Sequence, residues 1–470
     1  MDRAAIPAVA PGPRSGTCRV APVRVVAAAA RRRGGLPALI AACSASRLRW
    51  RRWRILLLAL LLAGCSGTSA DPREVVRFWA MGREGLVAQQ LVAGFEREHP
   101  GIRVEVQQLP WTAAHAKLLT AVAGGTTPDV SQMGNTWIPE MAALHALSPL
   151  DAQIAASRRI RPGDYFKGIW DSNVIDGHVY GVPWYVDTRL LFYRRDLLAA
   201  AGFDRPPRTW AEWTRMLAAL KARAAPGDYA ILLPLNEFEP LLSLALEQPQ
   251  PLLRDRDQYG NFENPGYRQA LRFYLQMFRS GYAPRIDNTQ VPNVPAEFGR
   301  GHFVFYISGP WMIQEFEQRM PAALRGQWMT APLPGPDGPG SGIAGGASLV
   351  LFKHAGHKRA AWQLIEYLSQ PAIQQQFHAL TGDLPPRRSS WALPGIADDP
   401  YAQAFRAQLE RARAVPRVPE WEEIVNEMQV IAARAAFGRM DVAAATAAMD
   451  RRSDAILAKR RWMLRRGTVP

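Results

Sequence analysis

Glu74-Val-Val-Arg-Phe-Trp79 and Ile102-Arg-Val-Glu-Val-Gln107 are the two runs of sequence that decide the fold class. The first has a strand pattern and ends in the loop Ala80-Met-Gly-Arg-Glu84. From about Gly85 to Glu98, apolar residues recur on one face, which predicts an amphipathic helix. Proline and glycine in His99-Pro-Gly101 end this helix. The second run alternates apolar and polar residues, which predicts a strand.

A second helix and a third strand are predicted directly after this pair. The helix is expected near Ala113–Ala123, and the strand at Asp129-Val-Ser-Gln-Met133, after a glycine-rich turn. Strands that alternate with helices are typical of an α/β domain with a parallel sheet. The sequence therefore predicts an α/β fold that begins at residue 74.

The rest of the chain is predicted to be more helical, with strands between the helices. The helical patterns cover Trp210–Arg223, Tyr267–Arg279, His357–Ser369, Ala372–Leu380, Pro400–Ala412, Trp421–Phe437 and Asp441–Arg461. Strand-like runs recur at Tyr180–Pro183, Leu190–Tyr193, Ala230–Pro234, Phe303–Ile307 and Ala347–Phe352. A chain of this length suits two lobes better than one core, so we expect two α/β lobes with a helical C-terminal part.

The segment before residue 66 has the pattern of a secretory signal peptide. A basic cluster at Arg47–Arg54, an apolar run at Ile55–Leu62 and the small residues Ala63-Gly64 before Cys65 follow one another in the required order. The apolar run is too short for a membrane-spanning helix, which needs roughly 20 residues. Leu62-Ala63-Gly64-Cys65 resembles the bacterial lipobox, so we expect Cys65 to be lipidated and to begin the mature protein. The alternative is an ordinary signal peptide with a chance cysteine.

Residues 1–46 precede this signal and show no periodic apolar pattern. They are either a misassigned start or a disordered extension, and they are left out of the fold prediction. We therefore expect residues 1–65 to be an extension with a signal peptide, and residues 66–73 to be a polar tether. The protein is expected to be exported and lipid-anchored at the periplasmic or cell-surface face of a membrane.

Cysteine usage narrows the chemistry of the mature chain. The three cysteines are Cys18, Cys43 and Cys65, so none lies beyond the expected cleavage point. A disulfide scaffold, a cysteine-based metal site and a catalytic cysteine are thereby excluded for the part after Cys65.

The positive charge of the chain lies mainly in the leader. The formal net charge is +16, and the twelve arginines and one aspartate of residues 1–65 contribute +11 of it. About +5 remains for the mature part, a mild excess that does not favour a nucleic-acid partner. The basic residues of the tail are expected at a solvated helix end or near anionic lipid, and they are Lys459, Arg460, Arg461, Arg465 and Arg466.

Eight segments in a fixed order carry a resemblance to a known family. They are Phe78–Glu84, Phe95–Val104, Gly124–Asp129, Gly181–Asp187, Leu191–Leu197, Pro207–Trp213, Phe303–Trp311 and Gly345–Leu349. Together they resemble the bacterial extracellular solute-binding proteins of family 1, the maltose- and trehalose-type receptors of ABC importers. The resemblance runs from about Val75 to the end of the chain.

The resemblance implies a two-lobed periplasmic-binding-protein fold, type II-like, whose lobes close on a sugar. It implies that residues 74–184 form the first part of lobe 1, residues 185–309 the first part of lobe 2, and residues 310–470 the returning segments of both lobes. Crossings between the lobes are expected around Pro183–Asp187, near Ser308–Trp311 and once further on. The expected partners are ABC permease subunits in the inner membrane, with no cofactor, no nucleic acid and a monomeric state.

A sugar has hydroxyl groups around its edge and apolar C–H groups on its faces. Its site needs aromatic rings beside carboxylate, amide and guanidinium groups. Ligand sites of α/β proteins form in loops at strand ends, and Glu84 and Trp111 are two candidates there. Glu84 either accepts sugar hydroxyls or stabilises a helix start through the helix dipole. Trp111 either stacks on a sugar ring or covers the end of the lobe.

Two further pairs follow later strands. Asn135 and Thr136 come after the third predicted strand, and they either bind hydroxyls or cap a helix. Tyr185 and Asp187 lie at the first expected crossing, and in an extended segment they point to the same side. The family has sugar contacts at this crossing, whereas the alternative role is packing of the hinge. Thr188 and Arg189 are secondary candidates.

The last candidates come from the second half of the chain. Trp311 either stacks on sugar or packs against a helix. Gly345 and Gly346 either let backbone amides approach a ligand closely or form a plain turn. Arg387 matches a position where relatives have a ligand-binding arginine, and its neighbour Arg388 is the other arginine that fits. The alternative for both arginines is a solvated surface pair.

Two other functions remain open. Paired carboxylates such as Glu84 and Asp187 also carry out glycoside hydrolysis, but no catalytic motif surrounds either of them. A receptor for a polyamine would need several acids, and one for a phosphate ester would need clustered arginines or helix N-termini. One or two acids, an arginine and many aromatic rings favour a neutral di- or oligosaccharide of the trehalose or maltose kind. The sequence thus predicts a binding protein and not an enzyme, without a metal site.

Overall fold

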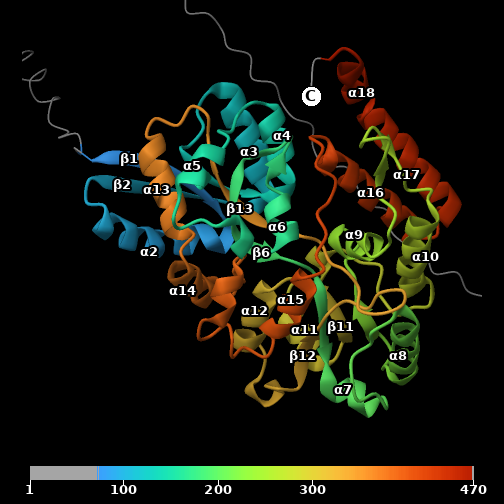
Figure 1. The fold of residues 1–470 in the computed structure, drawn as a ribbon. Helices are drawn as coiled ribbons and strands as arrows, with labels where there is room; N and C mark the ends of the chain where they lie inside the picture. The colour runs from blue at the N-terminus through green and yellow to red at the C-terminus, as the bar shows by residue number, and fades with distance from the viewer. Residues whose placement is uncertain (1–70, 72, 468–470) are drawn as a thin grey trace, which may run out of the picture. The chain divides into compact units, whose positions relative to one another are not determined.

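Two sheets organise the chain in the computed structural model, which describes residues 71 and 73–467 (Figure 1). The segment from Pro72 onward forms one compact unit. The expected signal peptide, the lipidated Cys65 and most of the tether lie outside the described residues, so these stay predictions. Among the helices of the described part, none has the length and apolar character needed to cross a membrane.

The first sheet has five strands in the order β2-β1-β3-β13-β6. Their bounds are β1 Glu74–Met81, β2 Ile102–Leu109, β3 Val130–Gly134, β6 Gly181–Asp187 and β13 Gly345–Leu351. Strands β1, β2 and β3 run parallel, as the sequence predicts, but β13 is antiparallel to both of its neighbours. The predicted parallel pairing is confirmed for the first three strands, whereas β13 runs the other way because it arrives from the second lobe and enters the sheet from the opposite end.

Helices cover both faces of this sheet, and we call the assembly lobe 1. One face packs against α2 (Gly82–Glu98), α13 (Lys358–Leu368) and α14 (Pro371–Thr381). The other packs against α3 (Trp111–Gly124) and α4 (Ile138–Ala143). Because side chains alternate along a strand, Leu349 and Val350 of β13 enter opposite cores.

Helix α2 begins directly at the end of β1, three residues before its predicted start. Gly82 makes this abrupt change possible because its φ is +52°, a backbone conformation that side-chain-bearing residues rarely adopt. As a result, Glu84 lies in the first turn of the helix instead of in a loop.

The second sheet has the order β12-β7-β11-β8 and forms lobe 2 with its helices. The strands are β7 Leu190–Arg194, β8 Tyr229–Leu232, β11 Phe303–Ser308 and β12 Trp328–Ala331. The helices are α8 Trp210–Arg223, α9 Glu239–Leu246, α10 Pro265–Arg279, α11 Val294–Arg300, α12 Trp311–Arg319, α15 Ala402–Leu409, α16 Trp421–Ala436, α17 Val442–Ile456 and α18 Ala458–Arg465. The predicted helix over Asp441–Arg461 is therefore two helices, α17 and the first half of α18.

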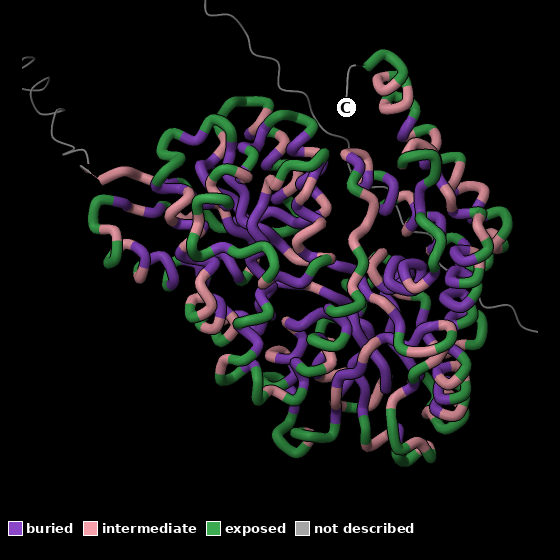
Figure 2. Tube along the Cα trace, in the orientation of Figure 1, coloured by how far each residue is buried: buried purple, intermediate pink, exposed green. Residues whose placement is uncertain are grey.

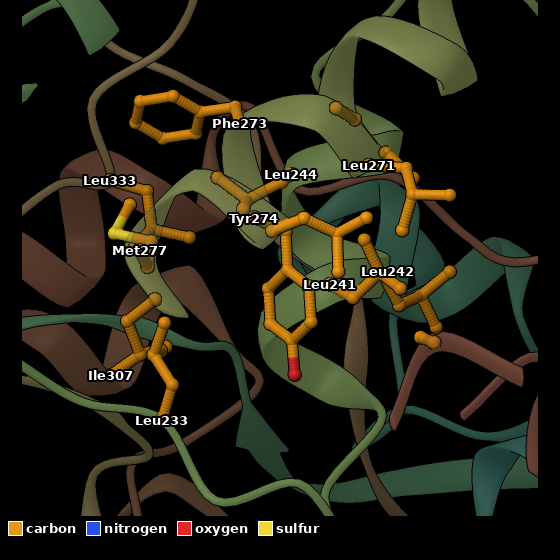
Figure 3. Packing of buried hydrophobic residues seen from close by; sticks show 14 of the residues in the cluster. Leu233, Leu241, Leu242, Leu244, Leu271, Phe273, Tyr274, Met277, Ile307 and Leu333 are labelled. Carbon is orange, nitrogen blue, oxygen red and sulfur yellow. The ribbon is translucent and has the colours of Figure 1, made fainter. Parts of the chain in front are cut away.

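The largest apolar core lies in lobe 2. Figure 3 shows leucines of α9, such as Leu241 and Leu244, beside Leu271 and Tyr274 of α10. Helices α16 and α17 pack against α10 and extend this core, so the helical C-terminal part belongs to lobe 2. In Figure 2 the strands and the inner sides of these helices are buried, whereas the outer loops are exposed.

Short elements complete the chain. They are α5 Asp151–Ala156, α6 Lys167–Asp171, α7 Arg195–Ala200, β4 Val174–Ile175, β5 His178–Val179, β9 Leu253–Arg254 and β10 Tyr259–Gly260. Single 3-10 turns lie at Asn135–Trp137, Pro162–Asp164, Asn288–Gln290, Ala322–Leu324 and Arg388–Ala392.

The chain crosses between the lobes at places that differ in part from the expected ones. The first crossing is the two-residue link Thr188–Arg189 between β6 and β7, so residues 185–187 still belong to the sheet of lobe 1. The second crossing follows β12 and ends at β13, and it is not at Ser308–Trp311 as expected. Gly309 and Pro310 instead start α12, whose Phe316 packs on Phe192 of lobe 2. A third crossing lies between α14 in lobe 1 and α15 in lobe 2.

Candidate functional site

Residues of both lobes line a cavity of about 810 Å³. Lobe 1 contributes the residues at the ends of β1, β3 and β6, and lobe 2 contributes α9, α16, the end of β11 and the start of α12. Nine of the ten predicted binding residues line this cavity, namely Glu84, Trp111, Asn135, Thr136, Tyr185, Asp187, Trp311, Gly345 and Gly346. The cavity therefore brings together predicted residues that are far apart in the sequence.

Glu84, Tyr185 and Trp111 form one corner of the cavity. Burial raises the pKa of Glu84, although hydrogen bonds from its own backbone amide, from Tyr185 and from Trp111 favour the charged form. The Tyr185 hydroxyl also accepts a hydrogen bond of 3.1 Å from Gln132 Nε2. A Cβ atom on Gly82 would lie 2.8 Å from the Trp111 ring, so only glycine lets this ring approach Glu84 so closely. Trp111 keeps 36% of its surface exposed and offers a ring to a ligand.

Asp187 forms an ion pair with Arg189, which also donates to Glu239 Oε1 over 2.6 Å. Burial raises the pKa of Asp187, and the charge of Arg189 opposes this rise. The guanidinium lies over the ring of Trp311, 4.7 Å from its centroid. Trp311 also packs against the apolar core of lobe 2, so it both lines the cavity and packs against its helix.

A third acid of the cavity, Asp383, follows α14 and is almost completely buried. Burial raises its pKa well above the ordinary range, and repulsion from Glu84 and Asp187 raises it further. No local pattern around Thr381-Gly-Asp383 marks this residue in the sequence, since its neighbours in the cavity come from distant segments.

The 3-10 turn that follows β3 brings Asn135 and Thr136 to the cavity. The Asn135 amide donates to the carbonyl of Ala344 over 2.6 Å and to Ser172 Oγ over 3.1 Å. Its N–H groups are therefore already used in hydrogen bonds within the protein. The Thr136 hydroxyl donates to Glu422 Oε2 over 3.3 Å, which links lobe 1 to α16 of lobe 2. Neither side chain caps the turn.

Gly345 and Gly346 open strand β13 beside the end of β6. A Cβ atom on Gly345 would overlap the carbonyl oxygen of Asp187, and one on Gly346 would overlap that of Tyr185. Gly346 also has a φ of +131°. Both glycines are thus required for the close pairing of β13 with β6, independently of any ligand contact.

Arg387 does not line the cavity, in contrast to the prediction. Its guanidinium forms an ion pair of 2.7 Å with Asp164 and donates to the carbonyl of Ser369 over 2.7 Å. Arg388 pairs with Glu410 instead. The segment after α14 turns both arginines toward neighbouring loops, and the guanidinium groups in the cavity belong to Arg83 and Arg189.

The charge of the cavity differs from the interpretation of the sequence. One or two acids and an arginine were expected, whereas seven carboxylates and two guanidinium groups line it. The acids that the sequence does not predict as lining residues are Glu237, Glu239, Glu315, Asp383 and Glu422. In the described part of the chain, no group of three or more histidine, cysteine, aspartate or glutamate residues is arranged to hold a metal ion. The cavity therefore combines aromatic rings with many hydrogen-bond acceptors.

Comparison with known proteins identifies relatives of the chain. The profile of the family "Bacterial extracellular solute-binding protein" matches residues 81–375. The solved sugar-binding protein MalE from the phytopathogen Xanthomonas citri is 56% identical, with a TM-score of 0.80 over 83% of this chain and 99% of that one. Two curated relatives are 27% identical, a putative binding protein of Brucella abortus over 81% of this chain and 93% of its own, and an uncharacterised lipoprotein of Streptomyces antibioticus over 78% and 84%. The two-lobed α/β fold is thus the one shared with MalE-type binding proteins.

Proposed function

Since the chain belongs to the family of bacterial extracellular solute-binding proteins, we propose that it is the substrate-binding component of an ABC sugar importer. The observation that carries this proposal is the cavity, where aromatic rings stand beside carboxylates at the ends of strands from both lobes. Rings suit the apolar faces of a sugar, and carboxylates suit its hydroxyl groups. The similarity to a solved sugar-binding protein over nearly the whole length of that protein supports the same ligand class.

The proposed ligand is a di- or oligosaccharide of the trehalose or maltose kind. A cavity of about 810 Å³ lies within the range of roughly 300–1,000 Å³ that small-molecule sites occupy. Ligand that touches Tyr185 in lobe 1 and Trp311 in lobe 2 at the same time would favour the closed arrangement of the lobes.

The proposed setting is the outer face of a membrane, where Cys65 carries the lipid anchor and permease subunits receive the sugar. The signal-peptide pattern that ends at Cys65 supports this, and one relative bears the name lipoprotein. Incorporation of a radiolabelled fatty acid into the full chain, and its loss in Cys65→Ser, tests the anchor. Label that persists in Cys65→Ser would contradict lipidation at this residue.

The experiment that tests the ligand is a thermal-shift and calorimetry screen of the chain from residue 66 onward. We expect trehalose, maltose or sucrose to raise the melting temperature, because a ligand at 100 times its Kd stabilises by about 2.7 kcal/mol. Putrescine and amino acids serve as the comparison, since the many acids of the cavity would also suit a polyamine. A shift with putrescine and none with any sugar would overturn the proposal.

A glycoside hydrolase is the second candidate function, and one observation favours it. The pKa values of Glu84 and Asp187 are both raised, and a raised pKa is what a general acid needs. Asp187 is already held by Arg189, however, and the family consists of binding proteins. Incubation with disaccharides, followed by an assay for monosaccharide release, separates the two functions, since a binding protein returns its sugar unchanged.

A further inference from the structure

Arg189 joins three separate elements at the first crossing between the lobes. Its guanidinium donates through Nη1 to Asp187, the last residue of β6 in lobe 1, and through Nη2 to Glu239, the first residue of α9 in lobe 2. Its flat face lies over Trp311, the first residue of α12. One side chain thus contacts a carboxylate from each lobe and an aromatic ring, and two of these three partners are predicted sugar contacts.

Burial keeps most of this arrangement away from solvent. Only 8% of the Arg189 surface is exposed, and its two carboxylate partners are three-quarters buried. Burial alone would lower the pKa of the guanidinium, but the charges of Asp187 and Glu239 raise it, so the group stays charged. A buried charge-assisted hydrogen bond is about twice as strong as a neutral one.

The geometry requires arginine and not just a positive charge. A guanidinium is planar, so it can donate from two edges while its face stacks on a ring. A lysine ammonium is a point charge that can satisfy one or two of these contacts but cannot stack in the same way. The partner ring is fixed from its own side as well, because a Cβ atom on Gly309 would overlap the Trp311 ring.

We propose that Arg189 is a positioning residue, which holds the Asp187 carboxylate and the Trp311 ring in the fixed relation that one sugar unit needs. This proposal rests on the proposed sugar-binding function. The guanidinium covers one part of the ring, so a sugar meets the remaining part of Trp311 together with the free acceptor positions of Asp187. Because Arg189 lies in the two-residue link between the lobes, the same contacts tie this geometry to the hinge.

The test measures sugar affinity in Arg189→Lys by calorimetry, with whichever of trehalose, maltose and sucrose binds the unaltered chain most tightly. We expect an affinity about tenfold weaker, because lysine keeps the charge but loses the paired hydrogen bonds and the stacking of the planar guanidinium. The control is Arg205→Lys, an exposed arginine that pairs with Glu212 on the surface, and it should bind as the unaltered chain does. Equal affinity in Arg189→Lys and the control overturns the proposal, whereas no sugar binding by the unaltered chain overturns the proposed function instead.

A double-mutant cycle distinguishes positioning from direct contact or general loss of structure. If Arg189 acts through Trp311, Arg189→Lys should weaken sugar affinity by only about threefold or less when Trp311 is already replaced by leucine. An unchanged tenfold cost in that background contradicts positioning through the ring. If Arg189→Lys does not fold, Glu239→Gln takes its place, since it removes the charge from only one of the two hydrogen-bond partners of the guanidinium. We then expect about threefold weaker binding, and unchanged affinity would overturn the proposal.

Discussion

Three carboxylates, the buried Glu84 and Asp383 and the largely buried Asp187, give the cavity its chemical character at the scale of single residues. Burial raises the pKa of each, and repulsion from nearby acids contributes at all three. A buried charge costs stability unless it is paired, so we expect the largest cost at Asp383, the most buried of the three, whereas Asp187 is paired with Arg189. Asp383 is therefore the residue for a test of stability, and Asp187 the residue for a test of binding.

Asp383→Asn tests the effect on stability. The raised pKa means that the folded protein holds this proton more tightly than the unfolded chain does. Stability therefore falls as the pH rises from the ordinary range of an aspartate through the folded pKa, and the asparagine variant lacks this loss. We expect its melting temperature to be about 2 °C higher at pH 8, with a smaller difference at pH 5, by calorimetry. Asp398→Asn, at an exposed position, is the control, and a lower melting temperature for Asp383→Asn would show that the Asp383 charge does not destabilise the fold.

Asp187→Ala tests the effect on binding. Removal of the carboxylate takes away a hydrogen-bond acceptor for sugar and leaves Arg189 with Glu239 alone. We expect sugar affinity to fall about 30- to 100-fold, as the loss of a charged hydrogen-bond partner implies, while the circular dichroism spectrum stays unchanged. Calorimetry that finds the affinity unaltered would remove Asp187 from the site.

Among the elements, β13 has the most demanding position, because it lies between β3 and β6 and lines the cavity with its first two residues. The register with β6 shifts between Ala347 and Ser348, next to the glycine pair. Close approach of two backbones at this bulge leaves no room for a side chain at Gly345 or Gly346. The glycines thus fix the pairing that holds Tyr185 and Asp187 in place.

Gly346→Ala should disturb this element. Its φ of +131° is strained for alanine, and the new Cβ would overlap the Tyr185 carbonyl oxygen. We expect a loss of about 2 kcal/mol or more in the free energy of unfolding, measured with urea, and weaker sugar binding. The matched control is Gly101→Ala, where a Cβ meets no atom within 4 Å. Equal free energies of unfolding for the two variants would show that β13 can move to accommodate a side chain without loss of stability.

The elements differ in how well the sequence predicts them, and α8 and α12 show why. Helix α8 has the predicted bounds, Trp210–Arg223, because Thr209 caps it and its apolar face is regular. The start of α12 lies where the family resemblance implies a crossing, and Gly309 and Pro310 give no local signal that decides between a loop and a helix start. Local signals decide the first case, whereas only the packing of Phe316 on Phe192 decides the second.

At the scale of the whole described unit, a polar contact joins the lobes across the cavity. Within lobe 1, His115 Nε2 of α3 donates to the Glu140 carboxylate over 2.7 Å. Glu422 of α16 in lobe 2 accepts a hydrogen bond from Thr136 and is attracted to His115. The two glutamates are the charges that face the histidine, and both favour its protonated form.

This contact predicts a pH dependence of binding. The hydrogen bond with Glu140 raises the pKa of His115, and the charge of Glu422 adds to the rise. The stabilisation is therefore fully present below the ordinary pKa of histidine and is lost as the pH rises through the raised value. We expect sugar affinity to fall about two- to threefold between pH 6 and pH 9. His115→Gln should flatten this dependence, and an equal slope in both proteins would refute the link.

The site was predictable as far as its residues follow strand ends. Strand ends predict Glu84 and Asn135 as cavity residues, because the ends of parallel strands in one sheet meet at a common edge. Asp187 also lines the cavity, but its prediction depends on the crossing that the family resemblance implies. Glu239 and Asp383 were missed, since each comes from a helix boundary whose place in the cavity depends on how distant segments pack. Arg387 matched a family position, yet its ion pair with Asp164 keeps it out of the cavity.

The insertion of β13 into the first sheet also sets the order in which a nascent chain can fold. Strand β6 has β13 as its partner in this sheet, so the sheet is incomplete until residue 351 has left the ribosome. More than 150 residues of lobe 2 are synthesised between these two strands. A truncated chain that ends before Gly345 therefore leaves the edges of β3 and β6 open to aggregation. Neither lobe can be cut out as a contiguous fragment, and the receptor must fold after nearly three-quarters of its chain has been made.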